Sequence, residues 1–119
     1  MITKADSMKV TLHEEFLGGK GVLKNVHFLD KDDAAGAGRL FVRSILTPGS
    51  SIGYHTHKGD FEVYYILSGI ALVNDNGEEH ILHAGDSILT RNGLSHSIEN
   101  AGNTDLEYIA LIIFDKEAG

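Results

Sequence analysis

The 119-residue chain carries a net charge of −7, with a pI near 5.3, and contains no cysteine. The acidic balance argues against binding to nucleic-acid phosphates or to anionic membranes, both of which require a basic surface. The absence of cysteine excludes disulfides, thiolate metal ligands and cysteine nucleophiles. The length predicts one domain spanning residues 1–119, and a hydrophobic content of 42% is enough for its core.

Short apolar runs separated by turn residues recur every eight to twelve residues, which is the spacing of an all-β sandwich or barrel. In chain order, the predicted strands are Met8–His13, Val22–Leu29, Arg39–Leu46, Val63–Leu67, Ile70–Val73, Glu78–His83, Ser87–Thr90, Ser95–Glu99 and Leu106–Phe114. The predicted turns and loops include Gly18–Gly21, Lys31–Gly38, Asn74–Gly77 and Ala84–Asp86. No segment shows convincing helical periodicity, so the expected fold class is all-β.

The apolar segments are also too short to cross a membrane. The longest lie around Tyr64–Val73 and Tyr108–Phe114, well below the length of a transmembrane helix. The N-terminal sequence MITKADSMKV lacks the apolar core of a signal peptide. We therefore expect a cytoplasmic protein with no membrane and no nucleic-acid partner.

Residues 49–69 contain two histidines and a glutamate that can meet at one point. Side chains two apart on a strand share a face, so His55 and His57 can aim their imidazoles together. A short loop over residues 58–61 then returns Glu62 at the start of the next strand. Two imidazoles and a carboxylate from adjacent strands are a candidate divalent-metal site.

A fourth candidate ligand, His96, lies further along the chain. It follows the turn dipeptide Asn92-Gly93 and lies in another short predicted strand, Ser95–Glu99. With this histidine, four side chains would complete a mixed nitrogen and oxygen site.

At these residues the chain resembles the cupin superfamily, and most of all its small single-domain bacterial members. The first cupin motif corresponds to residues 49–69 and is matched at every position, by Gly49, His55, His57, Glu62 and Gly69. The second motif corresponds to residues 85–100 and is matched by Gly85, Gly93, His96 and Asn100. The one departure is Arg91, where the family usually has a proline that stiffens the loop.

The resemblance implies a double-stranded β-helix of jelly-roll, or cupin-barrel, type. It also implies that the three histidines and Glu62 bind a divalent ion (Mn, Fe, Co, Ni or Zn) and leave open positions for an oxygen-rich small molecule. The alternative for the histidines is that they are packed core residues. Three histidines at the family spacing, together with the glutamate, favour the metal site.

The activity that the resemblance implies is left open among three readings. The first is a small metalloenzyme of dioxygenase, decarboxylase or isomerase type. The second is a non-catalytic module that binds a small metabolite, and the third is a structural barrel whose metal only stabilises the fold. One detail weakens the oxalate-decarboxylase option. Enzymes of that type place an arginine three residues before the first motif histidine, where this chain has Ile52.

Several other residues are candidates for the pocket. Tyr64 follows Glu62 on the ligand face and is a candidate catalytic acid, with a packed core tyrosine as the alternative. Tyr54 and Phe61 could line the mouth, and Arg43 could hold a carboxylate or form a surface ion pair. The four remaining histidines are expected to be surface or partly buried strand residues: His13, His27, His80 and His83.

A homodimer is expected because a small open-ended barrel leaves sheet edges that need covering. Met8–Leu12 or Val22–Leu29 could add to a neighbour's sheet. Arg39–Leu46 has apolar residues on both faces, which is consistent with an interface.

Overall fold

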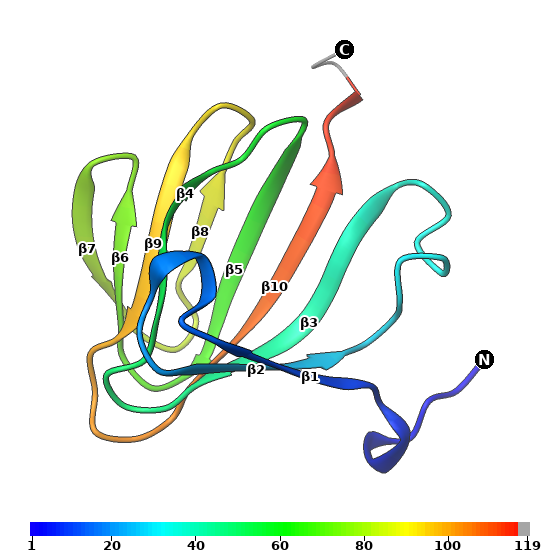
Figure 1. Cartoon of the computed structure of the whole chain (residues 1–119), viewed down its shortest axis with the longest axis horizontal. Helices are drawn as coiled ribbons and strands as arrows, with labels where there is room; N and C mark the ends of the chain where they lie inside the picture. Colours follow the sequence, from blue (N-terminus) through cyan, green and yellow to red (C-terminus); the bar gives the residue numbers. More distant parts are fainter. Residues whose placement is uncertain (117–119) are drawn as a thin grey trace.

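The computed structural model describes residues 1–116, and its regular secondary structure is almost wholly antiparallel strand (Figure 1). The strands are β1 (Val10–Glu14), β2 (Val22–His27), β3 (Gly38–Leu46), β4 (Ser51–Thr56), β5 (Asp60–Ser68), β6 (Ala71–Asp75), β7 (Glu78–Leu82), β8 (Ser87–Thr90), β9 (Ser95–Asn100) and β10 (Leu106–Phe114). Two short 3-10 turns, η1 (Ala5–Ser7) and η2 (Phe16–Gly18), are the helical elements of residues 1–116, and neither is long enough to cross a membrane.

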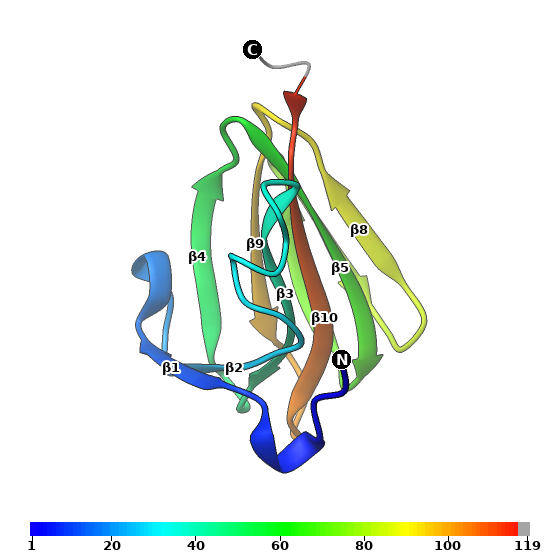
Figure 2. The ribbon, with the colours of Figure 1, turned by 90° about the vertical axis from the view of Figure 1, so that its right-hand side faces the viewer.

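The strands form two sheets that enclose the core between them. One sheet has six strands in the order β1-β2-β3-β10-β5-β8, and the other has four in the order β4-β9-β6-β7. Figure 2 shows β4 and β9 on one side of the molecule and β10, β5 and β8 on the other. This arrangement confirms the predicted all-β jelly roll.

The core follows from a two-residue alternation of buried and more exposed side chains along the central strands. On β10, Leu106, Tyr108, Ala110 and Ile112 face inward, and on β5 Glu62, Tyr64 and Ile66 do so. The predicted ligand face of β5 therefore lies inside the molecule. Buried residues of both sheets make up one apolar cluster, which includes Val42, Leu46, Ile52, Val73 and Ile98.

Two elements near the first motif differ from the predicted boundaries. β5 begins at Asp60, where a loop was predicted to run to residue 61, because Asp60 pairs with Phe114 of β10. β4 ends at Thr56, so His57 lies just beyond the strand rather than within it. The main chain of His57 is fixed instead by the loop of the second motif, because Gly93 N donates to His57 O at 2.7 Å.

Two motif residues serve the fold. The Asn100 side chain donates to the carbonyl oxygens of Leu46 and Thr104, both at 2.8 Å, and accepts from Gly102 N at 2.9 Å. Gly69 has φ +90°, and a Cβ there would lie 2.8 Å from Asp105 O, so this turn requires glycine. The turn at Arg91 closes without proline, through a 3.0 Å hydrogen bond from Leu94 N to Arg91 O.

Candidate metal centre

Four side chains from three parts of the fold converge inside the molecule: His55 of β4, His57 just after it, Glu62 of β5 and His96 of β9. Their ligand atoms all lie within 4.8 Å of one another. His57 Nε2 is 3.0 Å from Glu62 Oε1 and 3.1 Å from His96 Nε2. His96 Nε2 is in turn 3.1 Å from both His55 Nε2 and Glu62 Oε1. Glu62, His57 and His96 are buried, and His55 is partly open.

The register of the sheets produces this convergence. His55 pairs directly with His96 across β4 and β9. Glu62 pairs with Thr90 across β5 and β8 of the opposite sheet. The Thr90 hydroxyl then contacts His96 Nδ1 at 2.7 Å, so the two sheets meet at the cluster.

The outer nitrogen of each imidazole is held by a second group. His55 Nδ1 lies 2.7 Å from Gly53 O, and His57 Nδ1 lies 2.7 Å from Asp60 Oδ1. Both of these oxygens accept hydrogen bonds, so each Nδ1 carries the proton when its ring is neutral. The Nε2 lone pairs of His55 and His57 therefore point into the cluster, together with the carboxylate oxygen of Glu62.

Lone pairs at these separations repel one another unless a cation lies among them, so the chemistry of the donor set is consistent with a metal ion. The spacing also fits. Ligand atoms at right angles on an ion with bonds of about 2.1 Å lie about 3.0 Å apart. Tetrahedral ligands on bonds of the same length lie about 3.4 Å apart. The observed separations of 3.0 to 3.1 Å match the right-angled arrangement better.

The charges of the cluster without metal follow from burial and hydrogen bonding. Burial alone would lower the pKa of His57, but hydrogen bonds to Glu62 and Asp60 outweigh it and raise the pKa above its usual value. Burial would raise the pKa of Glu62, but its contacts with His57 and His96 lower it. Burial is the main cause of the lowered pKa of His55. A proton on His57 is thus the cation that competes with a metal ion.

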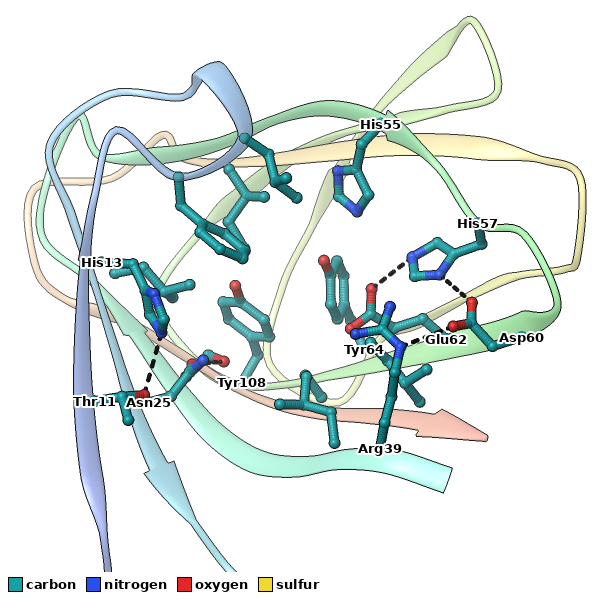
Figure 3. A pocket seen from close by; sticks show the side chains of 18 of the residues that line it. Thr11, His13, Asn25, Arg39, His55, His57, Asp60, Glu62, Tyr64 and Tyr108 are labelled. Carbon is teal, nitrogen blue, oxygen red and sulfur yellow. Dashed lines mark hydrogen bonds and ion pairs between the residues drawn. The ribbon is translucent and has the colours of Figure 1, made fainter. Parts of the chain in front are cut away.

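Sequence reasoning missed two residues of the site, Asp60 and Arg39 (Figure 3). Asp60 is buried and accepts from His57 Nδ1, and Arg39 Nε donates to its other oxygen at 2.9 Å. Asp60 lies two residues before Glu62, just as Tyr64 lies two residues after it. The alternation of side chains along a strand could therefore have predicted that Asp60 shares the ligand face. Arg39 comes from β3, and no local pattern connects it to the motif.

Tyr64 lies against the cluster. Its ring stacks on His96, with centroids 4.9 Å apart and planes at 10°, and its hydroxyl is 3.5 Å from His96 Nε2. Burial and then the charge of Glu62 raise its pKa well above the usual value, so the hydroxyl stays protonated. Its role as a catalytic acid stays a prediction.

A cavity of about 510 Å³ opens beside the cluster and includes Tyr64, His13 and His27 in its lining. Three predicted pocket residues lie elsewhere. Tyr54 and Phe61 line separate, smaller surface pockets, because their side chains fall on the outer faces of β4 and β5. Arg43 pairs with Glu107 on the outer face of the six-stranded sheet, so the surface ion pair is the correct alternative. His80 and His83 are exposed, as expected.

Comparison with known proteins gives matches along most of the chain. A family model described as "Cupin domain" matches residues 42–113. The oxalate-binding protein of Thermotoga maritima is 45% identical over 95% of this chain and 93% of its own length. The crystal structure of a predicted oxalate decarboxylase from the same organism has a TM-score of 0.91 and 44% identity, covering 97% of this chain and 100% of that one. The polyketide cyclase RemF of Streptomyces resistomycificus (TM-score 0.75, 17% identity, 97% of this chain and 80% of that one) shares the fold.

Replacing His57 or His96 with Ala should remove most of the bound metal while the chain remains folded and rich in β-structure. Each variant takes one of four converging ligand atoms away. Elemental analysis of the purified variants, with circular dichroism for the fold, measures this. His80→Ala, an exposed histidine, is the matched control and should keep the wild-type metal content. Full metal content in both cluster variants would contradict the ligand assignment.

Asp60→Asn should weaken metal binding by roughly tenfold to a hundredfold, although all four metal ligands remain in the variant. The amide can present its NH₂ group to His57 Nδ1, which favours the ring tautomer with the proton on Nε2, facing the metal. Calorimetric titration of Mn²⁺ into metal-stripped protein measures the affinity. Asp105→Asn, an exposed carboxylate, should have no effect. Equal affinities for wild type and Asp60→Asn would show that the carboxylate does not orient the ligand.

The stabilisation by metal should grow with pH. Without metal, the raised pKa of His57 stabilises the fold fully below its usual value of 6.5, and this contribution is lost as pH rises through the raised value. The lowered pKa of Glu62 stabilises the fold above 4.5, and that contribution is lost as pH falls. Metal needs the histidines neutral, so its affinity should be level above the raised pKa of His57, begin to decline as pH falls through that value, and decline further below about pH 6.5.

Melting curves with and without chelator, from pH 4.5 to mildly alkaline pH, test this pH dependence. The difference in melting temperature should be small at the acid end and widen towards neutral pH. A repeat at high salt separates ligation from general attraction to the acidic protein. A difference that is constant down to pH 4.5 would mean that histidines do not hold the metal.

Proposed function

The chain belongs to the cupin family, and we propose that it binds a divalent metal ion and, on that ion, a small oxygen-rich acid of the oxalate class. His55, His57, Glu62 and His96 would hold the ion. The observation that carries the proposal is the convergence of their ligand atoms within 4.8 Å, with four of the pairs at 3.0 to 3.1 Å. The outer nitrogens of His55 and His57 are fixed by acceptors. Nitrogen and oxygen donors of this kind suit Mn, Fe, Co, Ni or Zn.

The oxalate class is supported by the shape of the donor set and by the similar protein of Thermotoga maritima, which is named for oxalate binding. Four ligands at right-angled spacing leave two positions of an octahedral ion for a chelating pair of oxygens. A bound divalent ion supplies the positive charge that attracts and polarises those oxygens. The cavity beside it also carries Arg39 and Lys58, which add positive charge on the same side.

Tyr64 would orient the acid. Its hydroxyl is held next to the cluster by stacking on His96, and its raised pKa keeps it a hydrogen-bond donor. A donor at this place can bond to an acid oxygen that is turned away from the ion. The partly open His55 lies at the cavity, so the acid can enter from that side.

Catalysis on the same ligand is the second candidate, in the form of a decarboxylase, dioxygenase or isomerase. It is favoured by Tyr64, a proton donor beside the cluster. It is disfavoured by the other groups of the cavity. Both carboxylates in its lining, Asp60 and Glu62, are already hydrogen-bonded to imidazoles, and Ile52 occupies the position of the decarboxylase arginine in the apolar core. The described cavity therefore lacks groups that catalysis would need, and this favours non-catalytic binding.

Calorimetry with oxalate should show metal-dependent binding of one oxalate per chain. Wild type loaded with Mn²⁺ should bind, whereas metal-stripped protein and His96→Ala should not, because the acid has no ion to chelate. His80→Ala should bind like wild type. If metal-loaded wild type failed to bind oxalate, the ligand class would be wrong even with the metal site intact. Release of carbon dioxide or consumption of oxygen by the same sample would favour the enzyme over the binding module.

We also propose a homodimer that buries the outer face of the six-stranded sheet. Four apolar residues form one row across this face by direct register: Phe41, Leu111, Val63 and Leu89. Leu89 is 41% exposed, and the neighbouring Tyr65 is 44% exposed. A row of this kind is unusual on a surface that meets only water. The exposed Val10 and Leu12 on the edge strand β1 extend the apolar surface to the sheet edge.

Light scattering should give twice the chain mass of 12.9 kDa at micromolar concentration. Leu89→Lys places a charge in the apolar row and should shift the mass towards the monomer. Ile81→Lys is the matched control, since Ile81 is similarly exposed but lies on β7 of the other sheet. A wild-type monomer at this concentration would rule the dimer out.

A further inference from the structure

The end of the cavity remote from the metal ligands has a polar set of its own. Figure 3 shows Tyr108, Asn25 and His13 on one side of the pocket, with His57, Glu62 and Asp60 on the other. The remote residues come from β1, β2, β3 and β10, whereas the four ligands come from β4, β5, β9 and the turn after β4. The polar groups at this end are Thr11, His13, Asn25, His27, Ser44 and Tyr108.

The Tyr108 hydroxyl is the unusual member of this set. The side chain is completely buried, yet within residues 1–116 its oxygen is the one buried side-chain polar atom without a hydrogen-bond partner. The Ser44 hydroxyl lies beside it and slightly offsets the rise in the pKa of Tyr108, but it donates its own proton to Asn25 Oδ1 at 2.7 Å and makes no hydrogen bond of normal geometry with Tyr108. An unpaired buried hydroxyl costs stability, and a phenylalanine would avoid that cost. Such a group is therefore expected to have a partner when the protein is working.

Strand pairing and ring contacts fix the position of Tyr108 relative to the metal cluster. It lies in the middle of β10, paired with Ser44 on one side and Ile66 on the other. Its ring packs edge-on against Tyr64 at 4.9 Å, and Tyr64 stacks on His96 at the same distance. Tyr108 thus lies in the cavity lining, two ring contacts away from the cluster, and its hydroxyl is buried. Burial, followed by the charge of Glu62, raises its pKa, so it remains a donor.

The space and the lining between the two ends suit a larger molecule than oxalate. The cavity has a volume of about 510 Å³. Oxalate would fill no more than roughly 180 Å³, even at the ~30 Å³ that a water molecule occupies in the liquid for each heavy atom. Much of the remaining lining is apolar and includes Phe16, Leu23, Leu40, Ile52 and Ile112.

The two ends differ in charge. The permanently charged cations of the lining, Arg39 and Lys58, belong with the metal-ligand side, where Arg39 pairs with Asp60. The remote end has imidazole, amide and hydroxyl groups. His27 hydrogen-bonds to Thr11, and burial, Lys9 and His13 lower its pKa, so it is neutral at pH 7. An uncharged oxygen suits this end better than a second carboxylate.

We propose that the cavity takes a ligand longer than oxalate, with chelating oxygens at the metal, an apolar body, and a terminal uncharged oxygen that accepts a hydrogen bond from Tyr108. The inference rests on the proposed function, because the metal holds the first end of the ligand. No surface of Tyr108 is open to water, so the terminal oxygen has to part the wall side chains to reach it. Once there, it is shielded from competing water.

A pair of probes that differ in one oxygen tests the proposal. Phenylpyruvate and 4-hydroxyphenylpyruvate share an α-keto acid head and an apolar ring, and only the second has a terminal hydroxyl. Metal-loaded wild type should bind the hydroxylated probe about three- to tenfold more tightly. Tyr108→Phe should remove this preference and leave metal content and oxalate affinity unchanged. Tyr54→Phe, an exposed tyrosine outside this cavity, should keep the preference.

The outcomes separate this inference from the proposed function. If oxalate binds but neither keto acid does, or if Tyr108→Phe keeps the preference, the inference is overturned and the metal site stands. If wild type binds neither metal nor oxalate, both fail. A third measurement needs no ligand. Metal-free Tyr108→Phe should melt at or above the wild-type temperature, and a fall of about 4 °C or more would show that the hydroxyl serves the fold and overturn the inference.

Discussion

The structure depends on one electrostatic constraint: the ligand atoms of three imidazoles and a carboxylate lie within 4.8 Å of one another, and His96 Nε2 lies 3.1 Å from each of its three neighbours. These electron-rich atoms repel one another unless a cation lies among them. The surrounding residues must therefore hold the four side chains in place. Gly53, Asp60 and Thr90 do this by fixing the outer nitrogen of each ring. The protein therefore prepares the site before any ion arrives, which lowers the ordering cost of binding.

The same two-residue alternation that builds the site also builds the apolar outer surface. On β5, Glu62 and Tyr64 point inward to the cluster, while Val63 and Tyr65 between them point outward. On β10, Tyr108 faces the cavity, and Leu111 lies in the apolar row outside. A one-residue slip in register would exchange these two faces, so the pairing of β5 with β10 fixes both at once.

The cavity joins two chemically different ends. The end at the ligands is charged, with Glu62 and Asp60 balanced by imidazoles and by Arg39. The other end offers uncharged donors and acceptors, and its Tyr108 hydroxyl is unpaired. Much of the remaining lining is apolar, so a bound molecule would be oriented by its own distribution of oxygens rather than by shape alone.

The all-β class and the four residues of the cluster could be predicted from the sequence alone. Strand and turn patterns repeat over a few residues, and two separate motifs that resemble those of the cupin family indicated His55, His57, Glu62 and His96 as one set. The tertiary structure decided what no local pattern carries. It brought Arg39 of β3 to Asp60 of β5, turned Arg43 outward to Glu107, and buried the Tyr108 hydroxyl without a partner. These contacts join residues from different strands, and only the pairing of the strands and the packing of the two sheets bring such residues together.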